Sequence, residues 1–355
     1  MMHVALIGSG KIGEAIVTLF NSVGGYQLTV VDKDAERLAP MQALGATIVI
    51  ADVANDDLAS KLKGVNVVIS ACPFYLTPKL AKLARDIGAH YFDLTEDVES
   101  TRVVKEIAKG ATTVFMPQCG LAPGFISIAA NEIAQRFETL RDVNMRVGAL
   151  PIYPTNALKY NLTWSTDGLI NEYLNPCEAI IDGKIKETPP LEELEHFSMD
   201  GLDYEAFNTS GGLGTLCETL EGRVRNLNYK TVRYPGHCDI MKILVRDLRL
   251  SERRELLKDV LETAIPITLQ DVVLVFVSVS GNREGRLAQE SYAKKIYATN
   301  VNGKLLSAIQ LTTAAGICTM VDLLAKGELK GTGFIRQESV SLANFLANPF
   351  GKYYA

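Results

Sequence analysis

Gly8, Gly10 and Gly13 form a GxGxxG pattern close to the start of the chain. The pattern follows a short apolar run and precedes residues with helical periodicity, as in a dinucleotide-binding turn. Gly8 permits the tight turn, Gly10 lets backbone amides approach a pyrophosphate, and Gly13 allows the helix to pack closely on the strand. Lys11 and Ile12 complete the turn at the helix N-terminus, whose unpaired N–H groups would face the diphosphate.

Asp32 ends the second apolar run, about 20 residues beyond the glycines, where a dinucleotide-binding unit carries an acidic residue. A carboxylate there accepts hydrogen bonds from the adenosine ribose hydroxyls and repels a 2′-phosphate. We therefore expect NAD as the cofactor. Lys33 and Arg37 follow closely and leave NADP open, and a glycine-rich turn of another α/β protein is the alternative interpretation.

The ends of later strands would also line the cofactor, because the carboxyl ends of parallel strands meet at one edge of a sheet. Asp52 and Val53 would lie near the adenine. Cys72 and Pro73 would lie near the nicotinamide ribose, and Tyr75 would close over the nicotinamide. Ordinary loop residues and a packed aromatic ring are the alternatives for these positions.

Short buried runs alternate with helical patterns up to Met116, which predicts a parallel, doubly wound sheet. After Met116 the alternation breaks, and the pattern indicates an α+β domain with a mixed or antiparallel sheet. We expect a Rossmann domain over residues 1–124, completed by residues 305–355, and a substrate-binding and dimerisation domain over residues 125–304. The strand-like runs of the second domain are 143–149, 161–164, 231–233 and 271–279.

The composition narrows the class of protein. The 355 residues carry a net charge of −5 and no basic stripe, which argues against nucleic-acid binding. The apolar run at 272–279 is too short to span a membrane, and the N-terminus lacks the pattern of a signal peptide. Six cysteines occur singly among only four histidines, which predicts reduced thiols, no metal site and a cytoplasmic protein.

Several blocks of the sequence together resemble the saccharopine dehydrogenase-like family, and within it the lysine 6-dehydrogenase branch. The resemblance covers nearly the whole chain, and the blocks that carry it are GSGKIG at 8–13, HYFDLTED at 90–97, CGLAPG at 119–124, WSTDGLINEY at 164–173, TSGGLGTL at 209–216 and RYPGH at 233–237. It implies a two-domain oxidoreductase, dimeric, that acts on an amino acid held between the nicotinamide and the second domain.

Two departures help to choose the substrate within this family. The NADP-dependent saccharopine reductases tend to carry Asp where this chain has Ala122, and Arg where it has Thr166 and Asp167. An Arg fork grips a carboxylate, whereas an Asp favours an ammonium group. The substrate is therefore expected to be a diamine-type amino acid such as lysine.

The same blocks contain the candidate site residues. His237 follows a Pro-Gly turn and is the expected proton acceptor, with a structural histidine as the alternative. Asp93 ends a strand and would hold the substrate ammonium, unless it belongs to a helix cap with its neighbours. Arg233 would anchor the α-carboxylate, or else form a salt bridge elsewhere. Cys119 would lie near the substrate.

Trp164 and Ser165 open the WSTDGLINEY block, and the resemblance assigns both to the substrate site. Core packing is the alternative for Trp164, the only tryptophan.

Three functions remain open on the sequence. The first is NAD-dependent oxidation of the ε-amine of L-lysine to an aldehyde that cyclises to a piperideine carboxylate. The second is reduction of an imine, as in saccharopine or carboxynorspermidine synthesis. The third is a catalytically silent NAD-binding sensor, which would bind the cofactor and turn over no amine.

Overall fold

The computed structural model describes all 355 residues, which divide into two compact units. The first unit comprises Met1–Phe125, Asn300–Leu306 and Gln310–Ala355. The second unit comprises Ile126–Thr299 and Ser307–Ile309. The division expected from the sequence pattern lies at 124/125 and 304/305.

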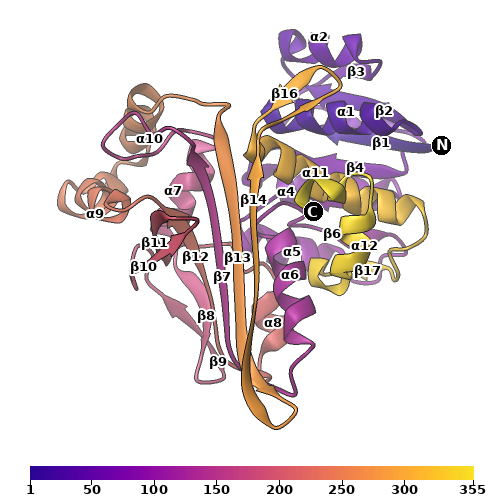
Figure 1. Ribbon diagram of the computed structural model, residues 1–355. Helices are drawn as coiled ribbons and strands as arrows, with labels where there is room; N and C mark the ends of the chain where they lie inside the picture. Colours follow the sequence, from indigo (N-terminus) through magenta and orange to yellow (C-terminus); the bar gives the residue numbers. More distant parts are fainter. The chain divides into compact units, whose positions relative to one another are not determined.

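The first unit is built on a parallel sheet of seven strands in the order β17-β6-β5-β4-β1-β2-β3 (Figure 1). Every neighbouring pair in this sheet is parallel, and the order runs outwards on both sides from β1, as in a doubly wound dinucleotide-binding sheet. The predicted Rossmann architecture is therefore confirmed. The strands are β1 (Met2–Ile7), β2 (Tyr26–Asp32), β3 (Thr47–Ile50), β4 (Val67–Ser70), β5 (His90–Asp93), β6 (Val114–Met116) and β17 (Gly333–Phe334).

Helices cover the first sheet because each presents one apolar stripe to it. In α4, for example, Leu80, Ala81 and Ala84 are fully buried at helical spacing, while the lysines of the same helix face solvent. The helices are α1 (Lys11–Val23), α2 (Ala35–Ala43), α3 (Leu58–Lys61), α4 (Thr77–Asp86), α5 (Val98–Ile107), α11 (Ala308–Ala325) and α12 (Leu342–Ala347).

Helix α11 is long and apolar enough to cross a membrane by length and composition alone, a feature that the sequence analysis passed over. Within the structure, 78% of its 18-residue window is buried. Its Asp322 accepts hydrogen bonds from the Tyr26 hydroxyl and from Asn348 Nδ2, the latter at 2.6 Å. These contacts are those of a core helix, whose one buried carboxylate is hydrogen-bonded within the first unit.

The second unit is built on a mixed sheet that contains the path β10-β11-β12-β7-β13-β14, with β8 and β9 attached beside β12. Strands β12 and β7 run parallel, and the other pairs are antiparallel, which confirms the predicted mixed sheet. The strands are β7 (Thr139–Pro151), β8 (Cys177–Ile181), β9 (Lys184–Thr188), β10 (Glu195–Met199), β11 (Leu202–Asn208), β12 (Val224–Arg233), β13 (Asp271–Arg283) and β14 (Arg286–Tyr297).

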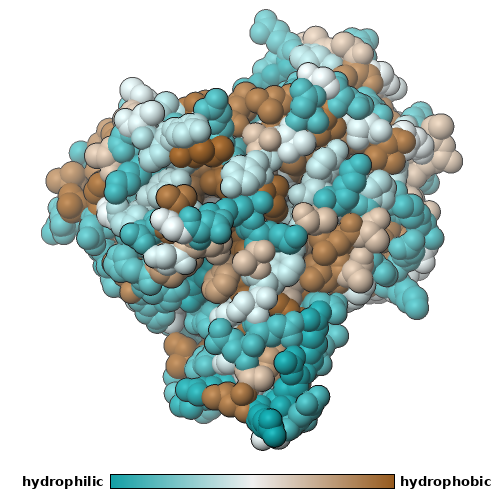
Figure 2. Space-filling model, in the orientation of Figure 1, coloured by the Kyte–Doolittle hydropathy of each residue, from teal (hydrophilic) through white to brown (hydrophobic).

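The helices of the second unit are α6 (Phe125–Ala134, whose first residue belongs to the first unit), α7 (Thr166–Leu174), α8 (Leu216–Leu220), α9 (His237–Lys242) and α10 (Arg254–Ala264). A core of buried side chains joins α7, α9 and α10, with Tyr173, Met241 and Leu257 among its members. The far end of the β13–β14 hairpin is covered mostly by hydrophilic residues (Figure 2), in keeping with the exposed positions that alternate along β14.

Two expectations for the second unit were wrong. Residues 161–164 form no strand, only an isolated bridge between Leu162 and Ile267. Residues 177–208, where the sequence analysis expects no strand, hold two hairpins, and one strand of each, β9 and β10, is mostly polar and not fully buried at any position. Their signals are the two-residue turns Asp182-Gly183 and Asp200-Gly201, in which all four residues have positive φ.

Candidate functional site

The glycine-rich turn connects β1 to α1 in the manner that a pyrophosphate needs. A Cβ on Gly8 would lie 2.7 Å from the carbonyl oxygen of Ala71, and a Cβ on Gly13 would overlap the carbonyl oxygen of Gly8. Gly10 is the N-cap of α1, no side chain caps the helix there, and no atom lies within 4 Å of a Cβ built on it. The open space and the uncapped N–H groups fit a phosphate.

Asp32 lies at the end of β2, beside this turn. Its Oδ2 accepts hydrogen bonds from Ser9 N and Ser9 Oγ, both at 2.7 Å, and its Oδ1 accepts one from Asp34 N at 3.1 Å. Partial burial acts to raise the pKa of Asp32, but the hydrogen bonds from Ser9, Asp34 N and Lys33 N together outweigh it and hold the pKa below its usual value. Asp32 is therefore an anion at the position where a nucleotide ribose lies in this fold.

The cations near Asp32 differ in whether they are already paired with a carboxylate of the protein. Arg37 Nε pairs with Asp34 Oδ2 at 3.1 Å, and both side chains are well exposed. Lys33 is exposed and makes no salt bridge within 4.0 Å. Lys11 is exposed and Ile12 half-buried at the start of α1.

The remaining predicted cofactor residues lie on loops at the carboxyl ends of β3 and β4. Asp52 accepts hydrogen bonds from Ala54 N and Asn55 Nδ2, so its carboxylate organises its own loop, which also contains the buried Val53. Burial raises the pKa of the Cys72 thiol to about 12, and its Sγ lies 3.4 Å from the carbonyl oxygen of Ile7. Pro73 is exposed, and Tyr75 beyond it is 68% exposed.

Asp93 lies at the end of β5 with both oxygens in use. Oδ1 accepts hydrogen bonds from Thr95 N at 3.0 Å and Gln118 N at 2.8 Å, and Oδ2 accepts one from the Tyr91 hydroxyl at 2.9 Å. These contacts tie the ends of β5 and β6 together. They favour a structural role over binding of an ammonium group, although the helix cap of α5 is supplied by Asp97 and not by Asp93.

Glu96 was not among the predicted site residues. Burial raises the pKa of its carboxyl to about 7, with Asp97 and Asp93 adding to the shift, while burial raises the pKa of Asp93 to about 6. No hydrogen bond or ion pair with another side chain holds the Glu96 carboxyl, which lies just beyond the end of β5. A carboxyl with a pKa near neutral pH can both accept and release a proton there, and this one lies on the sheet edge that carries the glycine turn.

Cys119 follows β6 and is 1% exposed. Its Sγ lies 3.1 Å from the carbonyl oxygen of Met116, and burial raises the pKa of the thiol well above its usual value. It is therefore a neutral thiol in the packing of this loop. Next to it, Gln118 has a φ of +65° and a buried Oε1 without a hydrogen-bond partner.

In the second unit, Arg233 lies at the centre of a buried group that we call the Arg233 cluster: Arg233, Tyr160, Glu172, Tyr173 and His237. Arg233 is 3% exposed, and its Nε donates a hydrogen bond to the Tyr173 hydroxyl at 3.0 Å. The guanidinium carbon lies 4.9 Å from the centre of the Tyr160 ring. The one carboxylate within 4.0 Å is that of Glu172, at 4.0 Å from Nη2.

Buried polar atoms without hydrogen-bond partners gather on the segments around this cluster. They are Asn161 Oδ1, Asn171 Nδ2 and Thr209 Oγ1, whereas the Tyr160 hydroxyl lies within reach of the Trp164 and Thr163 side chains. Each such atom costs about 1–3 kcal/mol when it stays unpaired, so three of them near a buried cation favour a place for a polar ligand.

His237 begins α9 inside the same cluster and is 1% exposed. Nδ1 lies 2.9 Å from the carbonyl oxygen of Leu158, and Nε2 lies 2.9 Å from the Tyr173 hydroxyl. Burial, and then the nearby Arg233, lower the pKa of His237 to about 3. A neutral imidazole with both nitrogens engaged favours the structural alternative: it orients Tyr173, which in turn receives Arg233.

The residues that open α7 have local partners. Ser165 is its N-cap, since its Oγ accepts a hydrogen bond from Gly168 N, and Trp164 is half-buried beside the core of α7, α9 and α10. Asp167 Oδ2 lies 2.6 Å from Lys258 Nζ, and Oδ1 lies 3.6 Å from Arg254 Nη2. Two cations of α10 thus balance Asp167, which removes the reason for assigning it to a substrate ammonium.

Two protein-family models match the chain, one over the first unit's glycine turn and one over the Arg233 cluster. Residues 4–116 match the model of the saccharopine dehydrogenase NADP binding domain, and residues 120–351 match that of the saccharopine dehydrogenase C-terminal domain. The chain belongs to the saccharopine dehydrogenase family. The predicted family membership is therefore confirmed, and the chain is a dehydrogenase-family protein with a pyridine-nucleotide-binding domain.

The chain is similar to proteins named alpha-aminoadipic semialdehyde synthase and to a solved saccharopine dehydrogenase. The mitochondrial alpha-aminoadipic semialdehyde synthases of Rattus norvegicus and Bos taurus are 20% and 19% identical over 78% and 82% of the chain. The chain spans about a third of the length of these relatives, 31% and 33%. The solved structure of saccharopine dehydrogenase (L-Glu forming) from Saccharomyces cerevisiae shares the fold over 100% of this chain and 96% of its own, with 17% identity and a TM-score of 0.78.

Within this saccharopine dehydrogenase-family chain, sequence reasoning found Arg233 and missed most of its surroundings. Tyr160, Glu172 and Tyr173 come from segments that an amphipathic pattern assigns to packing. The sequence did contain a signal for this cluster. Asn171 and Glu172 are polar residues at buried positions of α7, next to Leu169 and Ile170. Polar residues at buried helical positions require partners, and here one partner is Arg233.

Proposed function

We propose that this protein is an NAD-dependent oxidoreductase that acts on the CH–NH2 group of an amino acid, with the ε-amine of L-lysine as the group oxidised. The observation that carries the proposal is the buried Arg233 with its neighbouring unpaired polar atoms. A buried guanidinium that makes one hydrogen bond to Tyr173 and one long contact with Glu172 is suited to a substrate carboxylate as a closer partner.

The first unit supplies groups for the cofactor. Gly8, Gly10 and Gly13 leave room for a pyrophosphate at the N-terminus of α1, and Asp32 is an anion suited to ribose hydroxyls. A bound nicotinamide accepts a hydride from the substrate carbon. The preference for NAD rests on Asp32 and on the pairing of Arg37 with Asp34, which reduces the attraction for a 2′-phosphate.

The amine must lose a proton before its carbon can lose a hydride. Glu96 is the group that we assign to accept it, because its pKa of about 7 keeps a useful fraction of carboxylate at neutral pH. Proton and hydride loss convert the amine carbon to an imine, which water hydrolyses to the aldehyde and ammonia. The aldehyde then condenses with the α-amine to a piperideine carboxylate.

The test is a substrate panel with purified protein, in which absorbance of the reduced nucleotide is followed. The amines are L-lysine, L-ornithine, saccharopine and carboxynorspermidine, each with NAD and with NADP. Turnover of lysine with NAD supports the proposal in full. Activity with NADP alone would refute the cofactor assignment and leave the substrate assignment standing.

A second candidate is the formation or oxidation of a secondary amine such as saccharopine. It is favoured by the ion pairs of Asp167, because a neutralised carboxylate no longer selects a diamine over a dicarboxylate. Activity on saccharopine or carboxynorspermidine alone would select this function. Nucleotide binding without turnover of any amine would select the silent NAD sensor.

The protein is further proposed to act as a cytoplasmic homodimer. The support is the family resemblance together with the single, unpaired cysteines. Light scattering on the eluting peak of a size-exclusion column measures the oligomeric state directly, and a monomeric mass at working concentration would refute it.

A further inference from the structure

Glu205 on β11 is a buried carboxylate whose only partners are backbone N–H groups. It is 1% exposed, and it stands opposite Arg233 of β12 in the antiparallel register, yet it forms no salt bridge. Its Oε2 accepts a hydrogen bond from Gly236 N at 2.8 Å, and its Oε1 accepts one from Cys238 N at 2.6 Å. A buried carboxylate is costly without partners, so these two bonds are what compensates Glu205.

The segment that Glu205 holds is the turn between β12 and α9. Gly236 is the N-cap of α9, has a φ of +97° and brings no side chain of its own to cap the helix. The first N–H groups of a helix need acceptors from elsewhere, and Glu205 supplies them from the neighbouring strand. His237 lies between the two residues whose N–H groups Glu205 binds, so the carboxylate fixes the backbone on both sides of it.

From His237 the hydrogen bonds run in one direction to Arg233. The Leu158 carbonyl can only accept, so the proton of the neutral imidazole is on Nδ1. Nε2 is then an acceptor, and the Tyr173 hydroxyl donates to it at 2.9 Å. The Tyr173 oxygen in turn accepts from Arg233 Nε at 3.0 Å. The direction of the guanidinium therefore depends on where His237 lies.

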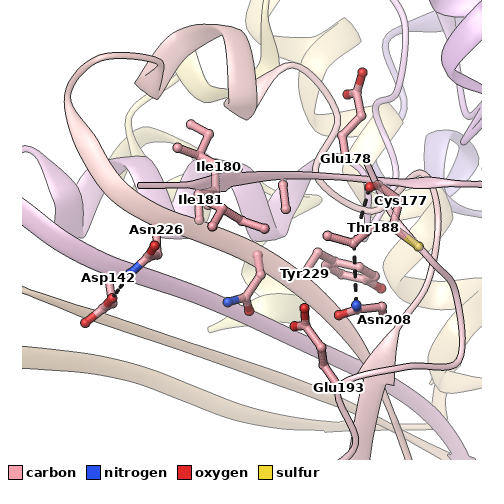
Figure 3. Close-up of a pocket in the computed structure, with 13 residues that line it drawn as sticks. Asp142, Cys177, Glu178, Ile180, Ile181, Thr188, Glu193, Asn208, Asn226 and Tyr229 are labelled. Carbon is pink, nitrogen blue, oxygen red and sulfur yellow. Dashed lines mark hydrogen bonds between the residues drawn. The ribbon is translucent and has the colours of Figure 1, made fainter. Parts of the chain in front are cut away.

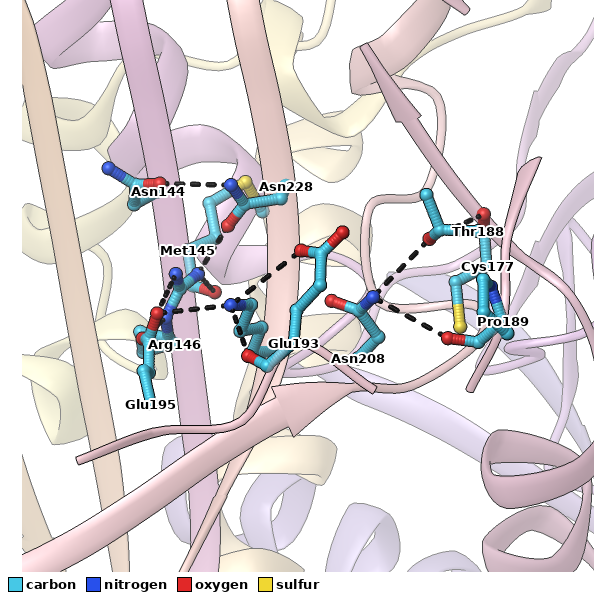
Figure 4. A network of polar contacts seen from close by, with 11 residues as sticks. Asn144, Met145, Arg146, Cys177, Thr188, Pro189, Glu193, Glu195, Asn208 and Asn228 are labelled. Atoms are coloured by element: carbon cyan, nitrogen blue, oxygen red, sulfur yellow. Dashed lines mark hydrogen bonds and ion pairs between the residues drawn. The ribbon is translucent and has the colours of Figure 1, made fainter. Parts of the chain in front are cut away.

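Arg233 needs this support because it lacks a close carboxylate. The other buried arginine of the second unit, Arg146, is held directly by the Glu195 carboxylate, with Nη2 at 3.0 Å from Oε2, and by Asn228 Oδ1 at 2.6 Å from Nη1 (Figure 4). The carboxylate of Glu172 lies 4.0 Å from Nη2 of Arg233. The hydrogen bond at Nε therefore matters more for the direction of Arg233 than its ion pair does.

We propose that Glu205 is a positioning residue of the substrate site: it holds His237, and through His237 and Tyr173 it directs Arg233 towards a substrate carboxylate. This inference rests on the proposed function, in which Arg233 binds that carboxylate. Glu205 does not line the cavity of about 260 Å³ that Figure 3 shows in the same unit. Its carboxylate supports the site through the backbone and does not contact the substrate.

The first test is independent of turnover and follows the imidazole nitrogens of the isotopically labelled full chain by NMR. The chain has only 4 histidines, and the signals lost in His237→Gln are those of His237. We expect a neutral His237 with its proton on Nδ1 in the wild type. Glu205→Gln leaves one acceptor oxygen for two N–H groups, so the His237 shifts should move towards the average of the two tautomers.

Unchanged His237 shifts in Glu205→Gln would overturn the proposal. Glu205→Asp is the second variant in case the amide does not fold. It keeps the charge, but it is one methylene group too short to reach both N–H groups, and it should move the same signals. Glu187→Gln, at an exposed position of β9, is the charge-matched control and should leave them in place.

The second test is calorimetric titration of L-lysine into the wild type, Glu205→Gln, His237→Gln and the double variant. We expect each single variant to weaken binding about tenfold, because each loosens one charged hydrogen bond at the site. The double variant should bind no more weakly than either single one, since both residues act through the same chain of bonds. In Glu205→Gln the KM for L-lysine should rise about tenfold while kcat stays within about twofold.

Affinity equal to the wild type in Glu205→Gln would overturn the role of Glu205 in substrate binding. Losses that add in the double variant would overturn the path through His237. A wild-type protein without affinity for L-lysine would instead refute the proposed function, and the His237 shifts would then decide alone whether Glu205 holds this turn.

Discussion

The glycine turn of the first unit and the Arg233 cluster of the second are both suited to anions, and they achieve this in opposite ways. The turn uses backbone N–H groups from residues 8–13, contiguous in sequence and open to solvent beyond Gly10. The Arg233 cluster uses one buried guanidinium, held by side chains from two other segments, helix α7 and the loop that contains Tyr160. Water solvates the first in the absence of a ligand, whereas protein groups must compensate the second.

The two sites differ in the kind of substitution that should damage them. A backbone site depends on the absence of side chains, so adding a single methyl group damages it. A buried charge depends on its partners, so removing one group leaves the others uncompensated. The five predictions below test this contrast, from the largest expected effect to the smallest.

Arg233→Met should lower kcat/KM for L-lysine about 100-fold or more, because removing one member of a buried, hydrogen-bonded charge group costs about 2–5 kcal/mol. Steady-state kinetics measure the loss, which should appear mainly in KM. The control is Arg225→Met on the same strand, where the side chain is 63% exposed. A folded Arg233→Met protein with the wild-type KM would refute the role of carboxylate anchor.

Gly13→Ala should destabilise the first unit by about 1–3 kcal/mol, because the new Cβ overlaps the carbonyl oxygen of Gly8. Thermal unfolding measures this. Gly10→Ala is the informative partner: its Cβ meets no atom within 4 Å, so stability should hardly change while nucleotide binding weakens. Equal losses of stability in both variants would contradict the distinct roles of the two glycines.

Asp32→Asn should reduce kcat/KM with NAD about tenfold and narrow the difference between NAD and NADP, because the ribose hydroxyls lose a charged acceptor. The two nucleotides are compared under otherwise identical conditions. Asp86→Asn, an exposed change at the end of α4, is the control. If the ratio of the two nucleotides stays constant, Asp32 does not determine cofactor choice.

Glu96→Gln should stabilise the protein at alkaline pH by on the order of 1 kcal/mol, a few degrees in Tm. The pKa of Glu96 is raised from 4.5 to about 7 on folding, so the folded protein holds a proton that the unfolded chain has released. The wild type therefore loses stability as pH rises across this window, and the variant does not.

The same variant should abolish the rise of kcat/KM near pH 7, and Glu99→Gln, exposed on α5, should change neither profile. A retained rise in rate with a flattened stability profile would show that Glu96 titrates without acting as the base.

Asp167→Asn should have the smallest effect, within about 0.5 kcal/mol in stability, because its partners Lys258 and Arg254 lie on a partly exposed helix. The KM for lysine should not change. A large rise in KM would restore Asp167 as the group that binds the substrate ammonium.

The Rossmann fold and the cofactor edge could be predicted because their signals are local. Alternating buried strands and amphipathic helices specify a parallel sheet, and the glycine spacing needs only one turn of chain to act. The hairpins between residues 177 and 208 were missed because one strand of each, β9 and β10, is charged or half-exposed, and the Asp-Gly turns carry the clearest signal. Propensity patterns are weak where a strand has no buried face.

By itself the sequence determined the family, the parallel, doubly wound architecture of the first sheet and the residue types of both anion sites. The tertiary structure alone decided which of those residues are free to act. Burial and two hydrogen bonds turn His237 from an apparent base into a support for Tyr173, ion pairs neutralise Asp167, and burial makes Glu96 a proton acceptor near neutral pH. Those properties depend on desolvation and on partners distant in sequence, which residue spacing does not encode.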